Sequence, residues 1–181
     1  LLSFAREPGS QRLELKRAGW VETTLLNGGQ GCVIRTDLND AARRSQMRGM
    51  TEAHRQRMAV STRQVFNFYT ADFKRGERIT YAGIEARRGV SCHKLLYTYA
   101  QGRVTTRYFA VNDDTLVSTV TDDGVESVEL GSQIVGGIKF PQQVEYYRDG
   151  NKLHTIVLTK IDVNPPLPPK IFKIPTAKAR N

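Results

Sequence analysis

Residues 77–163 constrain the fold most, because short segments that alternate polar and apolar residues recur there between turn residues. Val, Ile, Thr and Tyr are frequent in these segments and favour the pleated surface of a strand. Gly, Asp and Asn separate them at the spacing of hairpin turns. No helical periodicity falls between them, so a parallel sheet with crossover helices is not expected. The pattern predicts one large antiparallel sheet, with strands at 78–82, 93–99, 104–111, 116–120, 125–130, 144–147 and 153–161.

The residues before this sheet predict a smaller meander and then a helix. Period-two segments at 12–16, 20–26 and 32–35 are separated by Gly-rich turns, and residues 1–7 are expected to be a frayed end. A helical region is predicted over about 38–61, capped by Asp37 or Asn39. Gly49 predicts a break, giving two short helices or one kinked helix. Residues 65–69 then return to the sheet, with Phe66 and Phe68 on one face.

The predicted helical region carries all three methionines, Met47, Met50 and Met58, and it is strongly basic. If the helix runs on through Gly49, the methionines and His54 fall on one side of it and form a stripe. Residues 43–63 hold six arginines and one acid, Glu52, a local net charge of 6 − 1 = +5. The helix is then either packed on the sheet with solvated arginines outside or a movable lid. Methionine adapts to variable ligands, and basic amphipathic helices approach anionic membranes.

Composition suits one domain over residues 1–181. The net charge of +9 favours an anionic partner, either nucleic acid, a phospholipid surface or an acidic protein, or else marks a solvated basic surface. Two cysteines, Cys32 and Cys92, are too few for a disulfide framework or zinc site, and we expect two buried thiols rather than one bridge. No apolar run reaches the about 18 residues of a membrane span.

The two ends of the chain carry further expectations. The first residue is Leu1 rather than Met, so we expect that a leader or anchor was removed. The prolines at 165, 166, 168 and 169 exclude a central strand. Residues 171–175 are predicted to dock as a short edge strand, and 176–181 to form a loose tail.

No catalytic motif is present, so no enzyme activity, cofactor or metal is expected. The three histidines lie on separate predicted elements, and the acidic pairs at 113–114 and 122–123 fit hairpin turns better than a calcium loop. Basic and aromatic residues that would interleave on a nucleic-acid-binding sheet are Tyr97, Tyr99, Arg103, Arg107 and Tyr108. We favour the alternative that these tyrosines line a core or pocket, and a nucleic-acid partner is not expected.

Four short motifs occur in the order found in one protein family. They lie at residues 6–14, 27–34, 137–141 and 163–175. In this order they resemble the opening, the turn and strand, the Gly-x-x-x-Pro and the closing Asn…Phe…Pro of the lipoprotein carrier (LolA-like) family, in particular its outer-membrane lipoprotein-sorting branch. Cys32 stands where that family has Trp, and one extra residue follows Arg6.

The resemblance implies an α+β fold, in which a large curved antiparallel sheet forms an incomplete β-barrel with a helical lid. It implies an apolar cavity for acyl chains, no catalysis, and a location in the Gram-negative periplasm or at the outer membrane. An arginine at the Arg6 position holds the lid in that family. Expected partners are lipid acyl chains or a lipoprotein, with an anionic membrane surface as a further partner. The alternative function is a periplasmic protein-interaction or sensor module. Candidate cavity or lid residues are Met47, Met50, Met58, Phe66, Phe68, Ile79, Tyr81, Leu95, Tyr97, Tyr99, Ile156 and Leu158.

Overall fold

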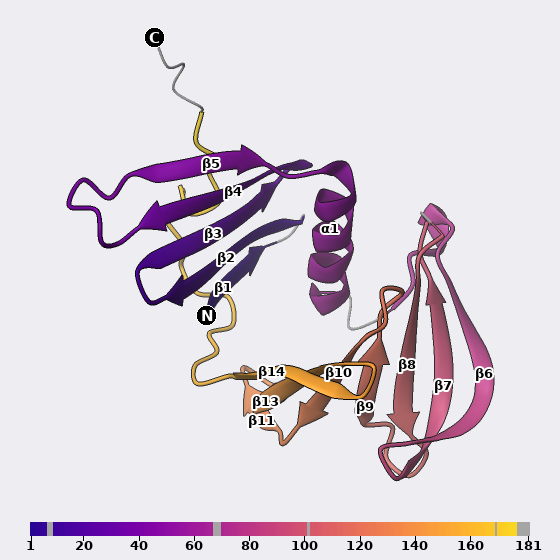
Figure 1. Ribbon diagram of the computed structural model, residues 1–181. Helices are drawn as coiled ribbons and strands as arrows, with labels where there is room; N and C mark the ends of the chain where they lie inside the picture. Colours follow the sequence, from indigo (N-terminus) through magenta and orange to yellow (C-terminus); the bar gives the residue numbers. More distant parts are fainter. Residues whose placement is uncertain (7–8, 67–69, 101, 169, 177–181) are drawn as a thin grey trace. The chain divides into compact units, whose positions relative to one another are not determined.

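The structure is a computed structural model that describes residues 1–6, 9–66, 70–100, 102–168 and 170–176. The chain divides into two compact units, unit 1 of residues 1–70 and 166–181 and unit 2 of residues 71–165. Within the described residues the fold is mostly antiparallel β with one α-helix (Figure 1). The single domain expected over residues 1–181 stays a prediction.

Unit 1 is built on a five-stranded antiparallel sheet, as far as its described residues show. Its strands are adjacent in sequence order because each connection is short enough to pair neighbours directly. The strands are β1 (Leu2–Arg6), β2 (Ser10–Arg17), β3 (Trp20–Asn27), β4 (Gln30–Asp37) and β5 (Ser45–Gly49).

Helix α1 (Glu52–Phe66) lies against one face of this sheet. Thr51 caps its start, since the Thr51 hydroxyl accepts a hydrogen bond from the His54 amide at 3.3 Å. The helix buries Met50 and Met58 against Leu26 and Val33 of the sheet. Burial of these apolar side chains is what holds the helix in place, because short helices are marginal on their own.

The C-terminal segment lies on the opposite face of the unit 1 sheet, drawn in yellow in Figure 1. The Arg12 guanidinium donates to the Ile171 carbonyl at 3.2 Å. Phe172 is 1% exposed, although most of the segment around it is polar or proline. In unit 1, α1 therefore packs on part of one side of the sheet, and this segment packs on the other side.

Unit 2 contains a seven-stranded antiparallel sheet in the order β14-β13-β10-β9-β8-β7-β6, counted over its described residues. The sheet is open, with β6 and β14 at its edges, and the β11-β12 hairpin stands apart from it. A single 3-10 turn, η1 (Phe73–Arg75), precedes β6. The strands are β6 (Arg78–Arg87), β7 (Val90–Thr98), β8 (Val104–Ala110), β9 (Leu116–Val120), β10 (Val125–Leu130), β11 (Gln133–Val135), β12 (Ile138–Phe140), β13 (Gln143–Arg148) and β14 (Asn151–Val157).

The predicted antiparallel meander of unit 2 is confirmed. Strands β9 and β10 have the predicted bounds, while the last strand ends at Val157 rather than 161. Hairpin turns fall at the predicted sites, where Arg88 (φ 52°) and Asp149 (φ 50°) precede glycines with positive φ. Two successive positive φ angles fit the right-handed twist of the strands they join.

The helix predicted over 38–61 is wrong in its first half. Residues 38–44 form turns, and β5 pairs with β4 from Thr36↔Ser45 to Cys32↔Gly49. Asp37 accepts the Asn39 amide at 2.8 Å, so it stabilises a turn rather than a helix start. Pairing with β4 provides this segment with inter-strand hydrogen bonds, which outweigh a weak helical preference.

Three further expectations about local structure are corrected. Residues 2–6 are not frayed, because β1 pairs with β2 along its whole length. Phe66 ends α1 instead of lying on a strand, and Phe68 lies outside the described residues. Residues 171–175 dock through buried Phe172, but they form a turn and irregular structure rather than an edge strand. Of the predicted tail, residues 177–181 lie outside the described part.

Candidate functional site

The strand register of unit 2 sorts its side chains onto two faces of the sheet, because successive residues of a strand point to opposite sides. Ile79 pairs with Tyr97, and Tyr81 with Leu95. We call this side the apolar face and define it by Ile79, Tyr81, Ile84, His93, Leu95, Tyr97, Arg107 and Phe109. We call the other side the ion-pair face and define it by Glu85, Arg87, Lys94, Tyr108 and Glu126.

A β-bulge brings Ile84 onto the apolar face. Tyr81 pairs with Leu95, but Ile84, three residues later, pairs with His93. Gly83 has a φ of 94°, a conformation that other residues rarely adopt, and it provides the extra residue of the bulge. Strict alternation places Ile84 on the other face of the sheet from Tyr81, so the sequence did not predict Ile84 as part of this site. A glycine inside a strand pattern was the available signal.

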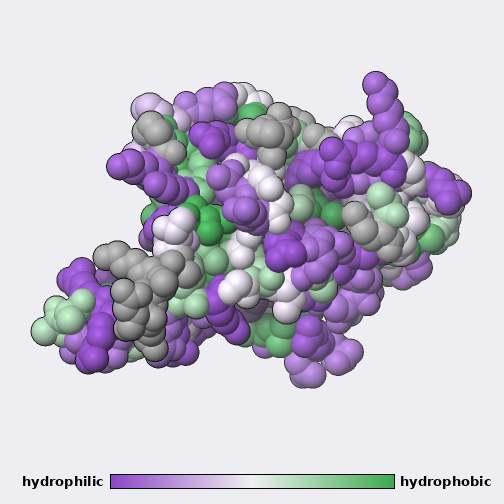
Figure 2. Space-filling model, turned by 90° about the horizontal axis from the view of Figure 1, so that it is seen from above, coloured by the Kyte–Doolittle hydropathy of each residue, from purple (hydrophilic) through white to green (hydrophobic). Residues whose placement is uncertain are grey.

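The edge strand β6 exposes apolar side chains on this face. Ile79 is 37% exposed, Tyr81 57% and Ile84 60%. The Tyr81 ring lies 5.8 Å from the His93 ring, tilted by 58°. Elsewhere hydrophilic residues cover much of the surface visible in Figure 2. A contiguous exposed apolar strip on an edge strand marks a binding site or an aggregation hazard.

Behind this strip the apolar face is closed by a buried aromatic and cationic group. The Arg107 guanidinium lies 4.2 Å from the Tyr97 ring and donates to the Tyr99 hydroxyl at 3.2 Å. Burial raises the pKa of Tyr97, and the nearby Arg107 charge opposes that rise. The stacked arginine holds both tyrosines in fixed positions, so the inner part of the face is preorganised.

The far end of the apolar face carries a second, smaller aromatic group. Tyr146 stacks on His154, with ring centroids 4.6 Å apart and planes 16° apart. Ile156 pairs with Val144 beside them. Thr119 and Ser127 lie between this end and Arg107, so the two apolar ends are separated by polar side chains.

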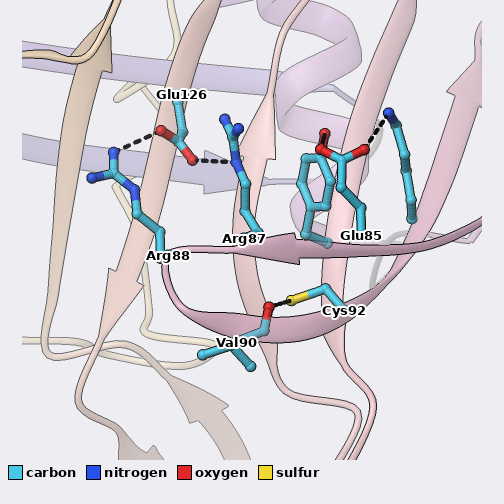
Figure 3. Close-up of polar contacts among 8 residues, drawn as sticks. Glu85, Arg87, Arg88, Val90, Cys92 and Glu126 are labelled. Carbon is cyan, nitrogen blue, oxygen red and sulfur yellow. Dashed lines mark hydrogen bonds and ion pairs between the residues drawn. The ribbon is translucent and has the colours of Figure 1, made fainter.

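The ion-pair face is held by satisfied charges (Figure 3). Glu126 accepts from Arg87 Nε at 2.9 Å and from Arg88 Nη2 at 2.6 Å. Burial alone would raise the pKa of Glu126, but the hydrogen bond from Arg88 and the charge of Arg87 outweigh it and lower that pKa. Lys94 and the Tyr108 hydroxyl both donate to Glu85. Tyr108 and Glu126 are buried, so these paired groups fit a structural role.

The acidic residues at 113 and 123 stabilise their own hairpin turns. Asp113 Oδ1 accepts the Thr115 amide at 3.1 Å, and Thr121 donates its hydroxyl to Asp123 at 2.6 Å. Among the described residues no group of three His, Cys, Asp or Glu side chains is placed to hold a metal ion. Both cysteines are buried free thiols, as predicted.

The structure brings together part of the predicted site. Ile79, Tyr81, Leu95, Tyr97 and Tyr99 gather at one end of the apolar face, whereas Ile156 lies on β14 at the opposite edge of the sheet. Leu158 follows β14 and donates its amide to the Gln142 carbonyl at 2.9 Å.

The predicted sites in unit 1 are arranged differently. The methionines do not form one helical stripe, because Met47 is exposed on β5 while Met50 and Met58 are core residues under α1. Phe66 is half-buried at the end of α1. Arg6 contacts the C-terminal segment, with its guanidinium carbon 4.8 Å from the Phe172 ring.

Comparisons with known proteins give a fold likeness only. No family model and no curated protein matches the chain. The structure resembles a DUF1329 family protein from Desulfovibrio piger, with a TM-score of 0.39, 9% identity and coverage of 84% of this chain and 78% of that chain. It also resembles a Vibrio parahaemolyticus domain described as a candidate outer membrane lipoprotein-sorting protein, with a TM-score of 0.36, 7% identity and coverage of 86% and 79%. At these values the likeness carries no argument about the ligand.

The described residues include no helix long and apolar enough to span a membrane.

Proposed function

We propose that the chain is a non-enzymatic binding protein that holds lipid acyl chains, free or attached to a lipoprotein, on the apolar face of unit 2. The observation that carries this proposal is the exposure of Ile79, Tyr81 and Ile84 on one side of an edge strand. Leu95 and Tyr97 of the neighbouring strand extend the same surface inward.

Chain length should decide which lipids bind. Each buried methylene contributes about 0.8 kcal/mol, so ten methylenes contribute about 8 kcal/mol. Association costs about 4–15 kcal/mol in lost freedom. Short fatty acids therefore cannot offset that cost, and long chains are the expected ligands.

The proposal includes a periplasmic or outer-membrane-associated location, which rests on the four motifs shared with the lipoprotein carrier family. That resemblance also supports a sheet that curves around the acyl chain. A lid formed by α1 has less support, because Met50 and Met58 pack the helix into the core of unit 1.

The test is binding of a fluorescent long-chain fatty acid, together with native mass spectrometry before and after delipidation. The variant Ile79→Gln/Tyr81→Gln/Ile84→Gln should weaken binding at least tenfold, which is about 1.4 kcal/mol. Val104→Gln is the matched control, since Val104 is 37% exposed on the ion-pair side of β8. Equal affinity in all three proteins, or a purified protein that refuses lipid altogether, would overturn the proposal.

A protein partner is the second candidate, favoured by the ten-residue edge strand β6. An extended peptide could pair with its outer backbone groups and place alternate side chains on the apolar face. Hydrogen exchange separates the two functions. A paired peptide would protect backbone amides of β6, whereas an acyl chain forms no hydrogen bonds with them.

A further inference from the structure

Helix α1 covers only part of its face of the unit 1 sheet. It packs where Leu26 and Val33 point toward it. By the same alternation Trp20 of β3, Arg35 of β4 and Gln46 of β5 share that face, further along the strands.

A pocket of about 410 Å³ opens on this uncovered part. Strands β3, β4 and β5 form it together with the β2–β3 turn and the connection between β4 and β5. Its lining residues are Ala18, Gly19, Trp20, Arg35, Asp37, Asn39, Arg44 and Gln46.

Arg35 is held ready for an anion. Its guanidinium lies 4.3 Å from the Trp20 ring, which fixes its plane. Glu22 is directly opposite Arg35 in the register, yet no carboxylate among the described residues lies within ion-pairing distance of Arg35. Its N–H groups are therefore available to a ligand.

The other polar side chains complete a donor-rich site with one acceptor. Arg44 Nε donates a hydrogen bond to Asp40, and the two terminal nitrogens of Arg44 take no part in that contact. Asp37 accepts the Asn39 amide with one oxygen, and its carboxylate can accept a hydroxyl as well. The lining thus offers two guanidinium groups to a phosphate and a carboxylate to a neighbouring hydroxyl.

We propose that this pocket binds a phosphate ester that carries hydroxyl groups beside the phosphate, with Arg35 and Arg44 on the phosphate and Asp37 on a hydroxyl. The same chemistry occurs in a free glycerol phosphate and in a phosphatidylglycerol head group. The site lies wholly in unit 1, so it is independent of the acyl-chain site proposed for unit 2.

Trp20 makes the test direct, because it is the single tryptophan of the chain. Glycerol 3-phosphate should change Trp20 fluorescence saturably, while glycerol should not. Calorimetry provides a second readout that does not depend on the indole. Vesicles of phosphatidylglycerol, compared with phosphatidylcholine, give the lipid arm. A response to these vesicles alone would assign the phosphate to a head group.

Arg35→Gln should weaken binding at least tenfold in both readouts. Arg48→Gln is the control, because Arg48 is exposed on the same face but does not line the pocket. Absence of saturable binding in either arm, or an equal loss in both variants, would overturn the proposal. Fatty-acid binding should persist in Arg35→Gln, so failure here would leave the proposed function of unit 2 standing.

Discussion

The guanidinium carbon of Arg6 lies 4.8 Å from the ring of Phe172, which joins the first strand of the chain to its last described segment. Arg12 adds a hydrogen bond to the Ile171 carbonyl, next to Phe172. These contacts make the C-terminal segment a structural layer of unit 1.

Removing the Phe172 ring should destabilise unit 1. Phe172→Ala is expected to cost about 3–5 kcal/mol, because a buried ring is replaced by a cavity. Urea unfolding followed by Trp20 fluorescence measures this in unit 1. Leu2→Ala, at an exposed position on β1, should change the free energy of unfolding by less than about 0.5 kcal/mol. Equal effects would show that the segment does not contribute to stability.

The same substitution should expose one thiol selectively. Cys32 pairs with Leu25, on the side of the sheet that carries Arg12 and therefore the C-terminal segment, whereas Cys92 is in unit 2. Burial raises the pKa of both thiols, so neither is a ready nucleophile at neutral pH. In Phe172→Ala, labelling of Cys32 should accelerate about tenfold for each 1.4 kcal/mol lost, with Cys92 unchanged. Mass spectrometry after timed alkylation identifies the labelled residue. Parallel acceleration at both cysteines would contradict the expectation.

Acid should weaken unit 2 through Glu126. Its pKa is lowered in the folded protein, so the unfolded chain binds a proton first as pH falls. The stabilisation is present above the ordinary pKa of a glutamate, about 4.3, and is lost as pH falls through the lower folded pKa. Glu126→Gln should lower the free energy of unfolding at neutral pH. In acid, the free energies of unfolding of the variant and the unsubstituted protein should become more similar. Circular dichroism melts across this pH range measure the difference. Glu85→Gln breaks the more exposed ion pair with Lys94 and should therefore reduce stability less than Glu126→Gln does.

Two glycines on neighbouring strands should respond in opposite ways to alanine. A Cβ at Gly31 would lie 2.6 Å from the Met50 sulfur and 3.2 Å from the Leu25 carbonyl, whereas a Cβ at Gly49 meets nothing within 4 Å. Gly31→Ala should therefore destabilise unit 1 by about 1–3 kcal/mol through overpacking. Gly49→Ala should be neutral or stabilise by about 0.4–1 kcal/mol, because the unfolded chain loses freedom. Thermal melts of the two variants test this prediction, and similar melting temperatures for both would contradict it.

The methionines should separate into core and surface residues. Met58→Ala is expected to cost about 2–5 kcal/mol, because Met58 packs against the sheet. Met47→Ala, on the exposed strand β5, should stay within about 0.5 kcal/mol. Chemical unfolding of both variants tests this. A comparable loss of stability in Met47→Ala would show that Met47 is packed as tightly as Met58.

Local sequence determined most of unit 2. Period-two alternation between Asp, Asn and Gly turns is a short-range signal, which is why β9 and β10 have their predicted bounds. It also grouped Ile79 with Tyr81 and Tyr97 with Tyr99, since alternation alone places such pairs on one face.

Tertiary structure decided what depends on partners distant in sequence. Residues 45–49 became a strand because β4 was there to pair with them, although their composition is equally compatible with a helix. Which residues oppose one another across strands depends on register, and the bulge at Gly83 shifted it by one residue and returned Ile84 to the apolar face. Burial of Phe172 likewise depends on a sheet more than a hundred residues earlier. A sequence window contains neither partner, so only the folded chain fixes these contacts.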